Sequence, residues 1–356
     1  MKYSLLEVVH CAKCQNRLEV SEEYESKHRE MKEGKLKCSS CQEIFNVENY
    51  ILKFIEDENY SESWGELWTE TSDTIRDSST GGSFYYDTIF GKYSEDNADK
   101  NGFSVFGFEW EKNLEGNKVL EIGAGTGVCT EHLVKTGAEV FAVDMSNAME
   151  TFPESLKTLP NIHLIQADIT TDFMVKSFFD YIWFFQVLQH TPNTKETLGS
   201  VKEYLKIGGE LSVTAYAHSF YPWYHFVTKH LSFKQVYWLV KIFLPIRYAG
   251  QKLFYNLNLN FLSKIWGHLF HFVDPRDTYF LTMTGKMNDW PMGQMYNKNK
   301  NKKQLFWEIV INTFDTITPN YTNGLTLEEM QKELEENKYK DMKIWGKSGT
   351  RAKAKR

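Results

Sequence analysis

Short apolar runs alternate with amphipathic segments in the middle of the chain. Five runs rich in β-branched and aromatic residues predict strands, at residues 118–122, 139–144, 162–168, 179–185 and 209–216. Three segments between them have helical spacing of apolar residues, at 127–136, 147–157 and 194–206. Strands and helices in alternation are typical of a parallel sheet with helices on both faces. The sequence therefore predicts an α/β core over residues 116–217.

The flanking segments have other patterns. We expect a small module at residues 1–55, a linker and lid at 56–115, a helical cap at 218–305, and a helix with strands at 306–356. In the cap, Pro245 and Gly250 should break the helices. Near the end, Thr326 is the expected N-cap of "TLEEMQKELEEN". The last residues predict either two strands or one strand and a basic tail.

The stretch "KVLEIGAGTGV", residues 118–128, predicts a strand, a glycine loop and then a helix from about residue 127. Gly123, Gly125 and Gly127 let the backbone approach a ligand at the start of the helix. Asp144 ends the next predicted strand, where a carboxylate can accept hydrogen bonds from both ribose hydroxyls. To this point a dinucleotide site, an S-adenosylmethionine site and a tight turn without ligand remain open.

Two residues separate the nucleotide alternatives. The dinucleotide pattern G-x-G-x-x-G/A requires Gly or Ala at position 128, which is Val128 here. Glu121, directly before the loop, would repel a pyrophosphate but attract the ammonium group of a methionine moiety. The loop therefore favours S-adenosylmethionine over a nicotinamide cofactor.

The core resembles the class I S-adenosylmethionine-dependent methyltransferases. The likeness is carried, in order, by "VLEIGAGTG", "VFAVDMS", "NIHLIQADI", "FDYIWFFQVLQHTPN" and "LKIGGELSV". It implies a seven-stranded, mostly parallel Rossmann-like sheet with helices on both faces, and S-adenosyl-L-methionine as cofactor. It further implies that Asp144 binds the ribose, that Asp168 and Ile169 flank the adenine, and that Gln186 lies near the methionine portion, with Met145 also among the cofactor-binding residues. The cofactor loop would comprise Glu121, Gly123, Ala124, Gly125 and Gly127.

Two CxxC pairs occupy the N-terminal module. Cys11 and Cys14 form the first pair and Cys38 and Cys41 the second, so that four thiolates can complete a closed, structural zinc site. A redox dithiol and a pair of disulfides are the alternatives. The fifth cysteine, Cys129, is expected to be a buried small residue. The module is similar to a zinc-binding domain of some bacterial methyltransferases and to the small activator subunit of tRNA, rRNA and protein methyltransferases.

His190, in "QVLQHTP", follows the fourth predicted strand, near the place where the methyl group should lie. An imidazole there can act as a general base toward an oxygen acceptor, or it can merely shape the loop. The stretch "FQVLQH" stands where amino-nucleobase methylases carry "NPPY", which argues against DNA adenine methylation.

The expected cap is unusual in composition. Residues 220–273 include sixteen aromatic residues, six Lys or Arg, and no Asp or Glu, although the whole chain carries a net charge of −6. The aromatic residues can form the core of the cap. The cations suit an anionic or lipid-linked acceptor or a membrane surface, with RNA as the alternative. Lys298 to Lys303 and the final "RAKAKR" could extend this basic surface or simply be solvated.

The sequence thus predicts a methyltransferase acting on the oxygen of a small-molecule, glycan or lipid-linked acceptor. The alternatives are an RNA or protein methyltransferase that grips its substrate with the zinc ribbon, a cofactor-binding protein without acceptor chemistry, and a nicotinamide oxidoreductase. No signal peptide and no run of eighteen apolar residues is recognisable, so we expect a cytoplasmic protein.

Overall fold

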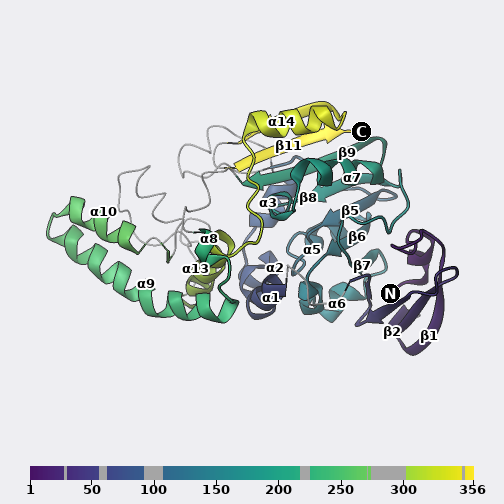
Figure 1. Cartoon of the computed structure of the whole chain (residues 1–356), viewed down its shortest axis with the longest axis horizontal. Coiled ribbons are helices and arrows are strands. Elements are labelled where there is room, and N and C mark those ends of the chain that lie inside the picture. Colours follow the sequence, from purple (N-terminus) through teal and green to yellow (C-terminus); the bar gives the residue numbers. More distant parts are fainter. Residues whose placement is uncertain are drawn as a thin grey trace. The chain divides into compact units, whose positions relative to one another are not determined.

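The computed structural model describes residues 1–27, 30–55, 62–91, 107–216, 225–270, 272–273, 302–346 and 349–356. The chain forms two compact units (Figure 1). The first comprises Met1–Thr69, Ser83–His218 and Asn323–Arg356, and the second comprises Glu70–Gly82 and Ser219–Thr322. Each unit is described separately below.

A single sheet of eleven strands forms the centre of the first unit, in the order β1-β2-β3-β4-β7-β6-β5-β8-β9-β11-β10. The strands from β4 to β9 in this order pair in parallel, and the remaining pairs are antiparallel. Their bounds are β1 Leu18–Lys27, β2 Glu30–Cys38, β3 Ile44–Glu48, β4 Ile51–Lys53, β5 Lys118–Ile122, β6 Glu139–Asp144, β7 Ile162–Gln166, β8 Phe179–Phe184, β9 Leu205–Tyr216, β10 Lys340–Trp345 and β11 Gly349–Lys355.

The five predicted core strands are confirmed as β5 to β9, with β9 beginning four residues earlier than expected. The predicted total of seven strands is too small. Strands β5 to β11 are neighbours in the sheet, but β1 to β4 continue it, because Ile51–Lys53 of β4 pair in parallel with Leu164–Gln166 of β7. The N-terminal residues therefore belong to the same sheet as the core.

Helices cover both faces of this sheet (Figure 1). Alternate residues of β5 point to opposite faces. Leu120 belongs to a buried cluster with Leu198 of α7 (Thr194–Tyr204) and Met330 of α14 (Leu327–Glu336). Val119 belongs to a second cluster, which includes Leu133 of α5 (Thr130–Leu133). The remaining short helices of this unit are η1 Tyr3–Glu7, α3 Phe84–Phe90, η2 Val134–Thr136, η3 Asn147–Thr151, α6 Glu154–Lys157 and η4 Leu188–His190.

Two predicted helices differ in extent. The helix after the glycine loop begins at Thr130 rather than at residue 127, because Gly127 has a left-handed φ of +84° that no helical residue adopts. The helix expected at 147–157 is divided into η3 and α6. Phe152, which precedes Pro153, is extended with ψ of 138°, as the residue before a proline tends to be.

The C-terminal elements agree with the prediction. The Thr326 side chain accepts a hydrogen bond from the Glu329 backbone, and the Glu329 side chain accepts one from the Thr326 backbone, so a capping box begins α14. The last residues form two strands, with β11 between β9 and β10. The alternative of a free basic tail is wrong: Arg351 is buried, and Lys353 pairs with Glu210 at 2.8 Å.

In the part of the second unit that the structure describes, the regular elements are helices, and they include the end of α1 (Glu62–Ile75), which begins in the first unit. Its helices are α2 Asp77–Thr80, α8 His225–Thr228, α9 Phe233–Asn256, α10 Asn260–Leu269 and α13 Lys302–Ile317. Among the described residues, no helix has both the length and the apolarity needed to cross a membrane. The basic stretch predicted at Lys298–Lys303 lies outside the described residues, except for the first two residues of α13.

The predicted breaks at Pro245 and Gly250 are wrong, because α9 runs through both. Pro245 is exposed, where water can solvate the carbonyl group that a proline leaves without a donor. Gly250 faces Trp266 of α10, and a Cβ atom at this position would lie 2.2 Å from the indole nitrogen. The glycine permits close helix packing rather than ending the helix.

Candidate cofactor and metal sites

The glycine loop leaves β5 in a conformation that only glycine adopts readily. Gly123, Gly125 and Gly127 have φ values of +76°, +53° and +84°. The backbone N–H groups of Gly123 and Ala124 both donate to the carbonyl of Val143, which ties the loop to the end of β6. A Cβ atom on Gly123 would lie 2.1 Å from Val187, whereas one on Gly125 would meet only the Trp68 indole nitrogen, 4.0 Å away. The backbone at Gly125 is therefore open to a ligand.

Asp144 is held directly against this loop. One carboxylate oxygen accepts a hydrogen bond from the Gly125 backbone at 2.7 Å. The other accepts from the backbone and the hydroxyl of Ser146 at 2.8 and 2.6 Å. Burial raises the pKa of Asp144, and these donors counteract that rise. The structure thus brings together the glycine loop and Asp144, which the sequence predicted to share one site. The role of Asp144 toward a ribose stays a prediction.

Glu121 lies at the other side of the loop, with only 2% of its surface exposed. Its carboxyl group accepts a hydrogen bond from the Thr130 hydroxyl at 2.6 Å, which links β5 to the first residue of α5. Burial raises the pKa of Glu121 to about 8. The geometry therefore shows a helix-anchoring contact, and the expected attraction of a ligand ammonium group stays a prediction.

The remaining predicted cofactor residues follow β6, β7 and β8. Met145 is half-buried directly after β6. The Asp168 carboxylate accepts hydrogen bonds from the backbone and hydroxyl of Thr170, and Ile169 is buried. Gln186 is exposed and has a left-handed φ of +57°, a conformation that costs a non-glycine residue about 1–2 kcal/mol.

All these residues lie at one edge of the sheet. Strands β7, β6, β5 and β8 are consecutive neighbours and run in parallel, so their carboxyl ends meet. In open parallel sheets this edge is the usual place for a ligand.

Helix α1 supplies residues that sequence reasoning missed. Trp68 approaches Gly125, and a Cβ atom on Gly65 would lie 2.0 Å from the Asn147 side chain of η3. The Trp64 and Trp68 rings stack with centroids 6.0 Å apart. The spacing of two tryptophans by four residues, in "ESWGELW", places them on one helix face and could have revealed this contact surface.

His190 lies between two aromatic rings. Its centroid is 5.1 Å from that of Trp64 and 6.1 Å from that of Tyr216 at the end of β9. Its backbone N–H donates to Val187 and closes the short helix η4. The half-buried imidazole therefore lies after β8, as predicted, and its role as a base stays a prediction.

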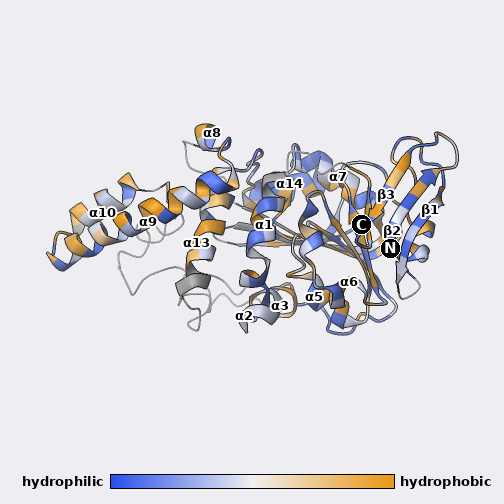
Figure 2. Cartoon of the chain, turned by 90° about the horizontal axis from the view of Figure 1, so that it is seen from below, coloured by the Kyte–Doolittle hydropathy of each residue, from blue (hydrophilic) through white to orange (hydrophobic). Residues whose placement is uncertain are grey.

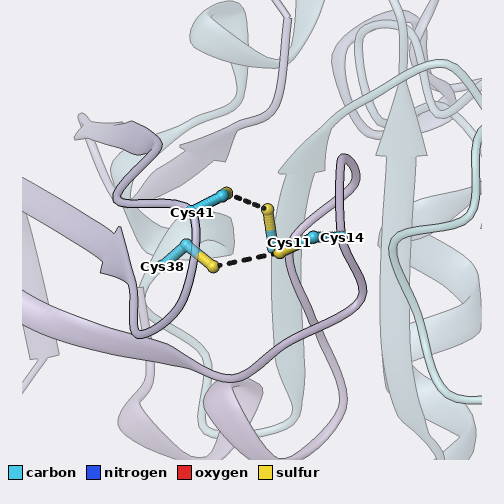
Figure 3. Close-up of side chains that lie close together, drawn as sticks. All are labelled: Cys11, Cys14, Cys38 and Cys41. Atoms are coloured by element: carbon cyan, nitrogen blue, oxygen red, sulfur yellow. Dashed lines mark hydrogen bonds between the residues drawn. The ribbon is translucent and has the colours of Figure 1, made fainter.

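The four cysteines of the CxxC pairs come together from separate turns (Figure 3). The sulfur atoms of Cys11 and Cys41 are 3.5 Å apart, those of Cys14 and Cys38 are 3.4 Å apart, and all four lie within 4.8 Å of one another. Four thiolates bound tetrahedrally at about 2.3 Å from one zinc ion would be about 3.8 Å apart. The cluster could therefore hold a metal ion.

The surroundings affect the four thiols differently, and burial raises the pKa of the Cys11 thiol to about 12. The Asn16 side chain donates to Cys14 and lowers the pKa of that thiol to about 6. The Ser40 backbone N–H donates to the Cys38 sulfur at 3.4 Å. Cys129, by contrast, is buried at the start of α5 and takes no part in the cluster, as predicted.

Comparison with known proteins agrees with this geometry. Residues 120–213, which include the glycine loop, Asp144 and His190, match the family model of a methyltransferase domain. This part of the chain is therefore similar to methyltransferase domains. The match extends over about a quarter of the chain.

Curated relatives are similar over the same region. The chain is 28% identical over 106 residues to the ubiquinone biosynthesis O-methyltransferase of Azoarcus sp. (strain BH72), which covers 27% of this chain and 42% of that protein. It is 29% identical over 111 residues to the protein of the same name from Xylella fastidiosa (strain 9a5c), covering 28% and 42%. The chain thus spans less than half the length of these relatives.

Two solved structures show weaker likeness. A putative O-methyltransferase from Nostoc punctiforme PCC 73102 has a TM-score of 0.39 at 12% identity, over 81% of this chain and 60% of its own. A complex of the Haloferax volcanii Trm112 methyltransferase activator with a putative methyltransferase has a TM-score of 0.33 at 15% identity, over 45% and 61%.

Proposed function

We propose that the protein transfers the methyl group of S-adenosylmethionine to an oxygen atom of a small-molecule, glycan or lipid-linked acceptor. The single observation that carries this proposal is the open backbone at Gly125, held by Asp144 at the carboxyl edge of the parallel sheet. The matched methyltransferase domain and the O-methyltransferase names of the curated relatives support it.

The residues at this edge fit the cofactor by their chemistry. Asp144 is an acceptor suited to ribose hydroxyls, and the apolar Ile169 and polar Asp168 suit an adenine. When bound, S-adenosylmethionine supplies an activated methyl group on a sulfonium ion. The glycine loop, Asp144 and Gln186 would hold the cofactor in place.

His190 is the proposed base. It follows β8, and its ring lies between Trp64 and Tyr216. With the cofactor bound, the imidazole of His190 would accept the hydroxyl proton of an acceptor whose oxygen takes the activated methyl group. The two aromatic rings would restrict the imidazole and exclude water.

We further propose that the four cysteines hold a structural zinc ion, because four sulfur ligands leave no position for a substrate. Cys11 and Cys38 also belong to the buried cluster that contains Ile165 and Phe173, so the ion would support the edge of the sheet near β7. The module's resemblance to activator subunits makes a protein or RNA substrate the alternative.

The first measurement is calorimetric titration with S-adenosylhomocysteine, with NADH in parallel. We expect binding of the first ligand alone, whereas binding of NADH alone would contradict the cofactor assignment. The second is transfer of a labelled methyl group in a cell extract, followed by separation of lipid, small-molecule, RNA and protein fractions. Label confined to RNA or protein would overturn the proposed acceptor class, and label in no fraction would favour a binding protein without acceptor chemistry.

His190→Ala tests the proposed base in the same assay. Removing a general base should lower kcat by about a hundredfold or more while leaving the affinity for S-adenosylhomocysteine unchanged. An equal loss of cofactor affinity would show instead that His190 only shapes the loop.

A further inference from the structure

Helices α9 and α10 of the second unit form an antiparallel pair with a small, close contact surface (Figure 1). Gly250 of α9 accommodates the Trp266 ring, and the Trp266 indole donates to the carbonyl of Arg247 at 3.0 Å. The Ser263 hydroxyl donates to the carbonyl of Gln251 at 3.2 Å. These residues define the side of each helix that faces the other. The sides that face away are identified by their exposed side chains.

The outer side of α9 is apolar. Trp238, Ile242, Ile246 and Leu253 each have between 43% and 55% of their surface exposed. They follow one another at intervals of four or seven residues, which places them along a single stripe of the helix. Soluble proteins rarely expose so many large apolar side chains side by side.

Helix α10 repeats the pattern. Phe261, Ile265 and Leu269 are spaced by four residues and are between 40% and 75% exposed. Leu257 and Leu259, in the turn between the helices, are also exposed. Figure 2 shows apolar residues over the length of both helices. The two stripes together form what we call the outer apolar face of the hairpin.

Within residues 220–273, only positive charges accompany this face. Lys234, Lys241 and Lys252 of α9 are exposed, and residues 220–273 contain no Asp or Glu. The Lys241 ammonium group lies 4.5 Å from the centre of the Trp238 ring, so a cation adjoins the apolar stripe directly. Elsewhere the chain is acidic, since its net charge is −6 in spite of these cations.

We propose that the outer apolar face binds the surface of an anionic lipid membrane, with α9 and α10 lying in the plane of the interface. An apolar stripe bordered by lysines and carrying Trp and Phe is the pattern of helices that rest at such an interface. Lysines near an anionic leaflet add attraction. This inference does not rest on the proposed methyl transfer.

Charge complementarity selects the membrane over a second copy of the chain. A twofold dimer formed through this face would place the same lysines of the two copies near each other, with no acid in residues 220–273 to neutralise them. Anionic headgroups would neutralise the lysines while acyl chains receive Ile242 and Phe261.

Sedimentation with sucrose-loaded vesicles tests the proposal on the full chain. We expect binding to vesicles of phosphatidylcholine and phosphatidylglycerol in equal parts, and much weaker binding to phosphatidylcholine alone. Ile242→Asp and Phe261→Asp should each weaken binding about tenfold or more, because each replaces an apolar contact with the acyl chains of the bound membrane by a charge. Lys241→Glu should weaken it at least about fivefold.

Matched variants on the first unit serve as controls. Ile207→Asp changes an apolar residue that is 90% exposed on β9, and Lys135→Glu reverses the charge of an exposed lysine in η2. Both should bind vesicles as the unchanged protein does. Retained binding of S-adenosylhomocysteine and an unchanged far-UV circular dichroism spectrum would show that the α9 and α10 variants are folded.

Three results would overturn the proposal. They are the absence of binding to anionic vesicles, equal binding to both vesicle types, and equal losses in the control variants. Concentration-dependent self-association that Ile242→Asp abolishes, without vesicle binding, would assign the face to a second copy instead. Failure of S-adenosylhomocysteine binding with vesicle binding intact would count against the proposed function and leave this inference standing.

Discussion

The Glu121 carboxyl group and the Thr130 hydroxyl form a hydrogen bond of 2.6 Å in which both side chains are buried. The contact joins the end of β5 to the start of α5 across the glycine loop. Because the pKa of Glu121 is raised to about 8 from a usual value of 4.5, the folded protein holds a proton that the unfolded chain releases in this range. Folding stability from this group is complete below pH 4.5 and falls until about pH 8.

Glu121→Gln should remove this dependence. Measured by urea unfolding without cofactor, the stability difference between the two proteins should shift by up to about 1.4 kcal/mol per pH unit between pH 5 and 8 in favour of the variant. In Thr130→Val the fall in folding stability should continue to higher pH, because the Thr130 hydroxyl stabilises the ionised form of Glu121. A constant difference across this range would show that Glu121 is ionised in the folded protein.

Gly125→Val should abolish binding of S-adenosylhomocysteine. At a φ of +53° a valine is strained, and its side chain would fill the open space before the loop. Gly208→Ala is the matched control, since Gly208 also has a positive φ, of +81°, and no atom within 4 Å of an added Cβ. Calorimetry should find binding lost only in the first variant; retained binding there would place the cofactor elsewhere.

Trp68→Ala should weaken binding of S-adenosylhomocysteine by a smaller amount, about tenfold, because it removes the side chain that borders the open space at Gly125 without altering the loop. Faster dissociation in stopped-flow measurements should account for the loss. Trp238→Ala, in α9, removes the same side-chain type from an exposed position and should leave the cofactor affinity unchanged.

Cys38→Ser should release the proposed zinc ion, and elemental analysis should find one ion per chain in the unchanged protein and none in this variant. Cys129→Ser is the control, because Cys129 is outside the cluster. The loss of stability in Cys38→Ser should reach beyond the first 55 residues, since the His10 backbone donates a hydrogen bond to the Phe173 carbonyl and β4 pairs with β7. Hydrogen exchange should therefore increase in β7 as well as in β1 to β4; full protection of β7 would contradict this coupling.

The sequence predicted the elements whose signal is local. Residues 118–122 and 139–144 are buried on both faces, so they read as continuous apolar strands, and the glycines between them require left-handed backbone. Thr326 was recognisable as a cap for the same reason, because its partner Glu329 is three residues away.

The sequence could not show contacts that depend on the whole fold. Strand β4 is only three residues long, and its partner β7 follows more than a hundred residues later. The continuous α9 was missed because Gly250 makes room for Trp266, a residue on another helix. Likewise, the approach of Trp68 to Gly125 arises from tertiary packing, although the spacing of Trp64 and Trp68 gave a partial sign.

The pairing of β4 with β7 also affects how the chain is made. Ile51 leaves the ribosome long before Leu164, its partner in the sheet. The backbone N–H and C=O groups at this edge of β4 therefore stay unpaired while the intervening residues are translated. An edge of this kind invites pairing with other chains.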